Sequence, residues 1–143
     1  MKFYTHKSKE FKPKTIFFAK NLIGMKKIYH LKTCTSCKRF LDKLLLPSDV
    51  VLQNVKSQPI TATELDQLKA LSGSYESLFS RKSKLYTEMG LKQLELTEDD
   101  YRHYILEHYT FLKRPVCVIN QQIFIGPSEE NLLAVRQLIS SNG

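Results

Sequence analysis

The chain has 143 residues, which is enough for one domain with a hydrophobic core and too few for two domains of ordinary size. Hydrophobic residues make up 42% and charged residues 25%, as in a globular protein, and no window is apolar over the roughly 18 residues that a membrane span requires. Three cysteines are unlike a disulfide-rich secreted scaffold, so we expect a cytoplasmic protein with redox or metal chemistry.

The formal net charge of +8 is concentrated near the N-terminus. Residues 1–24 hold six lysines against one glutamate, so the other residues carry only +3. A domain with so small a charge is not expected to bind nucleic acid directly. The first 24 residues show neither a hydrophobic period nor a secretory signal, whereas a domain pattern starts at Met25. We therefore predict a basic extension over 1–24, disordered or non-native with Met25 as the natural start, and one domain over 25–143.

The domain pattern opens with a strand, a helix and a strand. Alternating apolar residues predict a strand over 26–31, and β-branched residues predict another over 50–55. Between them, apolar residues at helical spacing predict a helix over 37–46, which Pro47 would end. Such a unit implies two parallel strands joined by a right-handed crossover.

Cys34 and Cys37 form a CxxC motif between the first strand and this helix. A cysteine at the start of a helix lies near unpaired N–H groups and the positive end of the helix dipole, and both stabilise a thiolate. Lys38, and His30 when it is protonated, would lower the Cys34 pKa further. Cys37, one turn deeper, would attack a mixed disulfide on Cys34 and release the partner. We therefore predict Cys34 as the nucleophile and Cys37 as the resolving thiol.

Two other interpretations of the motif stay open at this point. The two cysteines could be buried thiols without a reaction, although a CxxC in a βαβ context is typical of redox proteins. A zinc site needs four ligands, whereas Cys34, Cys37 and His30 supply three. Cys117 lies between two valines of a predicted strand and is expected to pack in the core. We therefore predict no metal site.

A helical segment follows the second strand. Thr61 and Glu64 form a capping box that begins a helix ending at Gly73. Residues 75–89 are expected to be helical in pieces, and a second capping signature at Thr97 begins another helix.

The last part of the chain predicts two strands and a helix. Strands over 115–119 and 122–125 flank Asn120-Gln121, a plausible hairpin turn, and Ser128 caps a final helix. The complete order is β-α-β, a helical insert, then β-β-α. This order predicts an α/β protein with a thioredoxin-like fold and a mixed four-stranded sheet.

Arg114 and Pro115 open the third predicted strand. In thioredoxin-like folds a cis proline at this point faces the CxxC and shapes the approach of the substrate. We therefore expect Pro115 to be cis and Arg114 to direct its guanidinium toward the thiol, where it could bind an oxyanion through two N–H groups. Without the fold argument, a surface arginine before a turn would be the favoured interpretation.

These residues resemble the ArsC/Spx family, which includes glutaredoxin-coupled arsenate reductases and the Spx transcriptional regulators. The resemblance covers about residues 25 to 140. The segments that carry it are Ile28-Tyr29-His30-x-x-x-Cys34, the CTSC sequence, Arg114-Pro115 and Gly126-Pro127-Ser128-Glu129-Glu130.

The resemblance implies roles for individual residues. Cys34 matches the nucleophile that attacks arsenate, His30 a histidine that tunes this thiol, and Arg114 an oxyanion-binding arginine. A further family arginine matches Arg81, or Lys82 if the register differs by one. The predicted substrate-binding residues are Arg114, Arg81, Lys38 and Pro115.

The chain departs from the best-studied arsenate reductases at two positions. Cys37 stands where they have a serine, and this CxxC is the Spx-like form. Gly126 stands where they have a third arginine, so the predicted oxyanion site has one positive charge fewer.

The predicted function is a thiol-based reductase of the arsenate reductase family. Cys34 would attack an oxyanion or disulfide, and Cys37 or an external thiol would resolve the adduct. No cofactor is expected to be bound, and glutathione, glutaredoxin or thioredoxin would supply the electrons. The alternative is an Spx-like redox-sensing transcriptional regulator that binds RNA polymerase, with a Cys34–Cys37 disulfide as its switch. A third hypothesis is a general oxidoreductase of protein disulfides.

Overall fold

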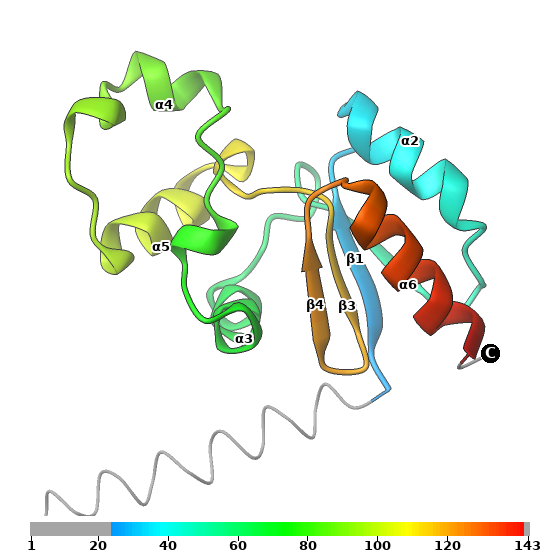
Figure 1. Cartoon of the computed structure of the whole chain (residues 1–143). Coiled ribbons are helices and arrows are strands. Elements are labelled where there is room, and N and C mark those ends of the chain that lie inside the picture. The colour runs from blue at the N-terminus through cyan, green and yellow to red at the C-terminus, as the bar shows by residue number, and fades with distance from the viewer. Residues whose placement is uncertain (1–23, 142–143) are drawn as a thin grey trace, which may run out of the picture.

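The computed structural model of the chain describes residues 24–141, which form one four-stranded sheet with helices on both faces (Figure 1). The strand order is β2-β1-β3-β4. Strands β1 and β2 are parallel, whereas β3 is antiparallel to both β1 and β4. The predicted α/β, thioredoxin-like fold with a mixed sheet is confirmed. The strands are β1 (Lys26–His30), β2 (Val51–Asn54), β3 (Val116–Ile119) and β4 (Gln122–Ile125).

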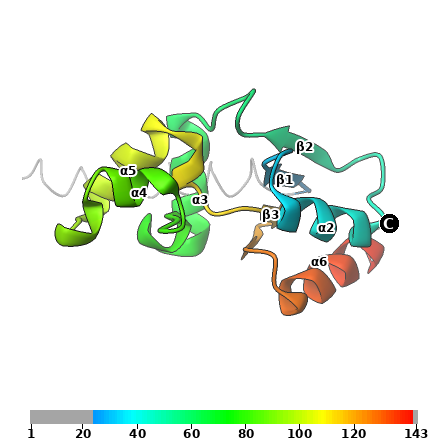
Figure 2. The same ribbon diagram turned by 90° about the horizontal axis from the view of Figure 1, so that it is seen from above.

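Side-chain alternation along the strands divides the core into two layers. Ile28, Cys117 and Ile119 face the helices α2 (Thr35–Leu44) and α6 (Glu129–Ser141) on one side of the sheet. The alternate residues of β1 and β3 pack against the other core layer, which includes Leu65 and Leu68 of α3 (Ala62–Ser72). Figures 1 and 2 show α2 and α6 together on one side of the sheet, and α3 on the other.

The insert between β2 and β3 forms a helical lobe beside the sheet (Figure 2). Its core is aromatic: the Phe79 ring stacks on Phe111, with centroids 5.3 Å apart, and packs against Tyr101 at 4.9 Å. The Arg102–Asp66 ion pair, at 2.8 Å, joins α5 to α3. Besides α3, the lobe contains α4 (Lys84–Glu88), α5 (Glu98–Glu107) and 3-10 turns at Glu76–Leu78, Leu91–Gln93 and Tyr109–Phe111.

The local signals of the sequence are largely confirmed. Thr61 and Thr97 each cap a helix through a complete capping box, and the Ser128 hydroxyl accepts a hydrogen bond from the Asn131 N–H at the start of α6. The turn between β3 and β4 has Asn120 at a φ of 48° and Gln121 at 72°, a left-handed turn that suits the twist of a hairpin.

The predicted bounds of the first helix are wrong by two residues at each end. Helix α2 starts at Thr35 because the Cys34 carbonyl already accepts a helical hydrogen bond from the Lys38 N–H, at 3.0 Å. It ends at Leu44 because Leu45 takes a left-handed conformation, with a φ of 52°, before Pro47 is reached. Cys34 therefore occupies the N-cap position, two residues closer to the helix terminus than the sequence predicted.

The predicted extension over 1–24 lies outside the described residues, apart from Gly24. Within residues 24–141, the helices are all too short or too polar to cross a lipid bilayer.

Candidate active site

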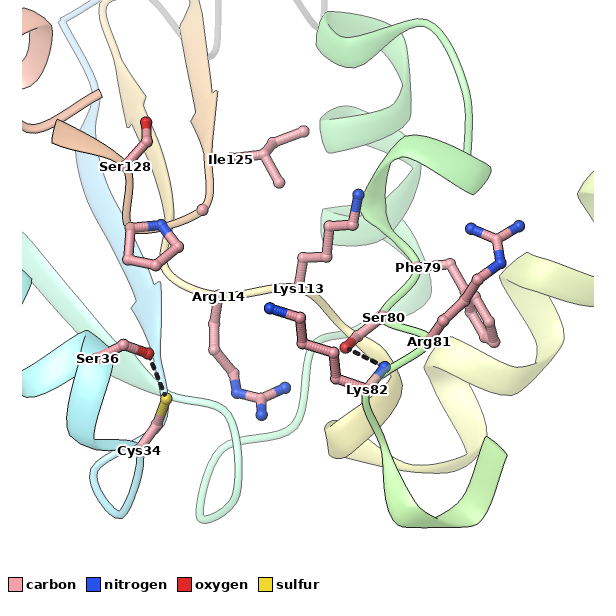
Figure 3. Close-up of a pocket in the computed structure, with 12 residues that line it drawn as sticks. Cys34, Ser36, Phe79, Ser80, Arg81, Lys82, Lys113, Arg114, Ile125 and Ser128 are labelled. Carbon is pink, nitrogen blue, oxygen red and sulfur yellow. Dashed lines mark hydrogen bonds between the residues drawn. The ribbon is translucent and has the colours of Figure 1, made fainter. Parts of the chain in front are cut away.

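Cys34 lies just beyond the C-terminal end of the inner strand β1, where the chain passes into α2. The Cys34 N–H donates to the Leu31 carbonyl at 2.9 Å, which fixes the turn, and the sulfur lies 3.3 Å from the Ser36 hydroxyl (Figure 3). Burial disfavours the thiolate, but hydrogen bonding from Ser36, the backbone N–H and thiol of Cys37, and the charge of Arg114 outweigh it. Together they lower the pKa of Cys34 to about 7, so about half of this thiol is ionised at neutral pH.

Cys37 has the opposite environment. Its side chain is 0% exposed on the inner side of α2. Burial, with the charge of Cys34 adding to it, raises the pKa of Cys37 to about 12. The pair therefore consists of one accessible, acidic thiol and one shielded, protonated thiol, as the sequence predicted for a nucleophile and a resolving cysteine. Cys117 packs in the core as predicted, and burial raises its pKa to about 12 as well.

Arg114 is held beside the thiol by the backbone. The bond from Arg114 to Pro115 is cis, as predicted, and the Arg114 Nη1 donates to the carbonyls of Thr110, at 3.2 Å, and Leu112, at 2.7 Å. The guanidinium extends toward the side of the pocket where Cys34 lies (Figure 3). Among the described residues its buried Nε–H has no hydrogen-bond partner, which is costly unless a ligand accepts from it.

A pocket of about 600 Å³ lies between the sheet and the helical lobe, with Cys34 at one end. The thiol side is formed by α2 and the loop from β4 to α6, and the facing side by the segment before α4. The lining contains four cationic side chains and no carboxylate. Its residues are Cys34, Ser36, Phe79, Ser80, Arg81, Lys82, Lys113, Arg114, Ile125, Gly126, Pro127 and Ser128.

Arg81 and Lys82 take different directions in this pocket. The Arg81 Nη2 donates to Glu76 at 3.1 Å and to the Tyr101 hydroxyl at 2.9 Å, and its guanidinium lies over the Phe79 ring. Figure 3 shows the Arg81 guanidinium directed away from Cys34, whereas the Lys82 side chain extends toward Arg114. Of the two registers that the sequence allowed, the structure favours Lys82 as the cation on the thiol side.

The remaining predicted residues lie outside the pocket lining. Lys38 is on the solvent side of α2, 71% exposed, with its Nζ 3.5 Å from Asp42 one turn along the helix. The pKa of His30 is lowered by burial and by the charge of Lys32, so its neutral form is favoured and it does not supply the predicted positive charge. Pro115 is buried and does not line the pocket.

Sequence reasoning missed two contributors to the site. Ser36 supplies the only side-chain hydrogen bond that the described residues give to the Cys34 sulfur apart from Cys37. A hydroxyl residue in the first turn after the nucleophile was the available signal. Lys113 lines the pocket next to Arg114, and its charge next to a predicted site residue could have been noticed. Within residues 24–141, no three His, Cys, Asp or Glu side chains gather in a way that could hold a metal ion.

Comparison with known families agrees with this geometry. The model of the ArsC family matches residues 29–135, which include the CxxC, the lobe and most of α6. The chain belongs to the ArsC family. Among curated relatives of this ArsC-family chain, the Global transcriptional regulator Spx of Streptococcus mutans is 30% identical over 107 residues, which cover 71% of the chain and 76% of the regulator. The uncharacterized protein YfgD of Escherichia coli K12 is 29% identical over 113 residues, covering 76% and 94%.

Solved structures share the ArsC-family fold. An arsenate reductase from Vibrio cholerae superposes with a TM-score of 0.67 and 23% identity, over 79% of this chain and 98% of that one. The solution NMR structure of a Staphylococcus aureus COL protein gives a TM-score of 0.60 with 26% identity, over 75% and 94%. At this identity the similarity establishes the fold, and the reaction has to be argued from the pocket.

Proposed function

We propose that the protein is a thiol-based reductase whose substrate is a small oxyanion or a disulfide. The observation that carries this proposal is the contrast between two neighbouring thiols, of which Cys34 lines a pocket with four cations and Cys37 is buried behind it. Cys34, with a pKa of about 7, is about half ionised at neutral pH where substrate can reach it, and Cys37, with a pKa of about 12, is protonated and shielded. This is the division of roles that a nucleophile and a resolving thiol require.

The first step would be attack by the Cys34 thiolate. With a disulfide, Cys34 forms a bond to one sulfur while the substrate S–S bond breaks. With arsenate, an As–S bond forms while an As–OH bond breaks and its oxygen leaves as water, which gives a thiol–arsenate adduct whose negative oxygens need hydrogen-bond donors. Arg114 supports both cases, because the Thr110 and Leu112 carbonyls already hold its guanidinium on the Cys34 side of the pocket, so the charge does not have to be reorganised when negative charge develops.

The second step would be resolution by Cys37. Once Cys34 is covalently bound to substrate, its negative charge is gone, and with it one of the causes of the high Cys37 pKa. Formation of the adduct therefore prepares Cys37 to attack the Cys34 sulfur and release the product. Glutathione, glutaredoxin or thioredoxin would then reduce the Cys34–Cys37 disulfide and complete the cycle.

The test is a coupled assay with glutathione, glutaredoxin, glutathione reductase and NADPH, in which NADPH loss is followed after arsenate is added. A small disulfide is tested instead on the pre-reduced protein alone, because glutathione and glutaredoxin reduce such a disulfide directly. We expect Cys34→Ser to abolish turnover. Arg114→Lys should reduce arsenate turnover by about 100-fold, since a lysine keeps the charge and loses the Nε–H donor. Cys117→Ala removes a thiol outside the pocket and is the matched control, expected to retain activity. Turnover that survives in Cys34→Ser would refute the proposal.

A second candidate is an Spx-like regulator that binds RNA polymerase. It is favoured by the CxxC and by relatives named Global transcriptional regulator Spx, in Streptococcus mutans and Streptococcus pneumoniae among others. In this case the Cys34–Cys37 disulfide would act as a switch. Size-exclusion chromatography of the reduced and oxidised protein with purified RNA polymerase tests it. Redox-dependent co-elution, together with no turnover of either substrate class, would decide for the regulator.

A further inference from the structure

The charge of the pocket is not balanced within the protein. Of its four cations, Arg81 is neutralised by Glu76 at 3.1 Å. The ammonium groups of Lys82 and Lys113 have neither an ion-pair nor a hydrogen-bond partner among residues 24–141. With Arg114, three positive charges therefore face one concavity that contains no carboxylate. Such an arrangement concentrates negative ligands and repels positive ones.

The pocket is also much larger than an oxyanion. Its volume of about 600 Å³ equals that of roughly 20 water molecules at about 30 Å³ each. It lies within the range of about 300 to 1,000 Å³ in which proteins bind organic ligands. A tetrahedral oxyanion on Arg114 would leave most of this space unused, and the cations beyond Arg114 would still lack partners.

The cations are distributed along the pocket and not gathered at the thiol. Figure 3 shows Lys82 directed toward Arg114 on the Cys34 side and Lys113 directed the other way, toward Ile125. Apolar surface from Phe79, Ile125 and Pro127 lies in the same lining. A ligand matched to this arrangement has a sulfur at the thiol end and a short organic chain that carries carboxylates, one within reach of Lys82 on the Cys34 side and one within reach of Lys113 further along the pocket.

We propose that Lys82 and Lys113 form a carboxylate subsite, so that the preferred substrate is a low-molecular-weight disulfide carrying carboxylates. This inference rests on the proposed reductase function and specifies its substrate class. The Cys34 thiolate attacks one sulfur of the bound disulfide, the substrate S–S bond breaks, and one half leaves as a thiolate. Cys37 then attacks the Cys34 sulfur, its proton passes to the departing second half, and two electrons have moved from the cysteines to the substrate.

Single-turnover kinetics of the pre-reduced full chain test the inference without any external electron donor. Three probes differ in charge: dithiodipropionate is anionic, hydroxyethyl disulfide is neutral and cystamine is cationic. Oxidation of Cys34 and Cys37 is followed by acid quench and mass spectrometry. Each rate is divided by the rate of the same probe with dithiothreitol, which removes differences in intrinsic reactivity.

We expect the normalised rate of the anionic probe to exceed that of the cationic probe by roughly tenfold or more at low salt, and the ratio to fall as salt is added. The double variant Lys82→Gln/Lys113→Gln should lower this ratio to about threefold, the remainder coming from Arg114, with the neutral probe changed less than about twofold. Lys43→Gln is the control for the loss of one charge and is compared with the single variants Lys82→Gln and Lys113→Gln, because the C-terminal turn of α2 places this lysine about 13 Å along the helix from Cys34.

The outcomes separate the two claims. If the neutral probe oxidises the cysteine pair but the wild-type ratio is near one, or the double variant keeps the full ratio, the carboxylate subsite is refuted and the reductase function stands. If the ratio falls as much in Lys43→Gln as in the single variants, overall charge and not the subsite is responsible, and the inference is again refuted. If no probe oxidises the pair, reduction of small disulfides is refuted and the subsite fails with it, whereas reduction of an oxyanion is decided by the arsenate assay.

Discussion

The Ser36 hydroxyl offers the sharpest test of why Cys34 is acidic. It lies 3.3 Å from the Cys34 sulfur. Burial raises the pKa of Cys34, and the hydrogen bond with Ser36 is the largest of the effects that lower it. A hydrogen bond to a charged group contributes about 1.5–3 kcal/mol to stability, but Ser36 is exposed and water would replace part of the bond. We therefore expect Ser36→Ala to raise the Cys34 pKa by about one unit, which corresponds to about 1.4 kcal/mol.

The consequence is measurable at neutral pH. With a pKa of about 7, about half of Cys34 is thiolate at pH 7, and after a rise of about one unit only about one tenth is. The rate of alkylation by iodoacetamide at pH 7 should fall about fivefold, whereas the rate well above both pKa values should not change. The other two thiols do not interfere, because Cys37 and Cys117 both have pKa values of about 12.

Two variants control this experiment. Ser36→Thr keeps a hydroxyl at the same position and should retain most of the low pKa. Cys34→Ser should abolish the alkylation and so assign the reaction. An unchanged pH profile in Ser36→Ala would show that Arg114 and the helix terminus are sufficient to ionise Cys34, and the assignment to Ser36 would be wrong.

Three further predictions concern stability. Folding lowers the Cys34 pKa from near 9 to about 7, so the thiolate stabilises the folded state as the pH rises. The free energy of unfolding of the reduced protein, measured by urea titration relative to Cys34→Ser, should therefore increase by about 1–2 kcal/mol between pH 7 and pH 9. A difference between the two proteins that does not depend on pH would contradict this. Glu64→Gln breaks the 2.8 Å ion pair with the mostly buried Lys27 and should lower the free energy of unfolding by about 1–3 kcal/mol at pH 7. This loss should vanish as the pH falls through the lowered pKa of Glu64, because the wild-type carboxylate is then protonated as well. A loss below that pKa equal to the loss at pH 7 would contradict this. Leu45 is 85% exposed and has a φ of 52°, where a residue with a Cβ is strained and glycine is not. Leu45→Gly should therefore stabilise the fold by about 0.5–1 kcal/mol and raise the midpoint of thermal unfolding by a few degrees. A lowered midpoint would show that contacts of the leucine side chain outweigh the backbone strain.

Features set by neighbours in the sequence were predictable. Both capping boxes, the β3–β4 turn and the placement of Cys34 at a helix start depend on residues within four positions of one another, so the local pattern contains the necessary information. The cis bond before Pro115 and the mixed sheet could be predicted only after the fold had been inferred, and the βαβ order followed by a late hairpin was enough to infer it.

Directions of long polar side chains were not predictable. Whether Arg81 or Lys82 faces the thiol depends on tertiary contacts, because the guanidinium of Arg81 is drawn to Glu76 and to the rings of Phe79 and Tyr101. Lys38 pairs with Asp42 on the solvent side of α2 and not with the pocket. The periodicity of the helix does not show which of its polar residues face the pocket and which face solvent.

The pocket lies between two parts of the chain, and this separates reactivity from selectivity. Cys34, Cys37 and Ser36 belong to α2 and its N-terminal cap, whereas Lys82 comes from the inserted lobe. The lobe enters after β2 and returns just before β3, so it is a continuous stretch of sequence. A chimera that exchanges this stretch with that of another ArsC-family member is therefore predicted to change which substrates are accepted, while Cys34 keeps its low pKa. Such modular exchange gives protein engineers a route to new reductants from one unchanged redox centre.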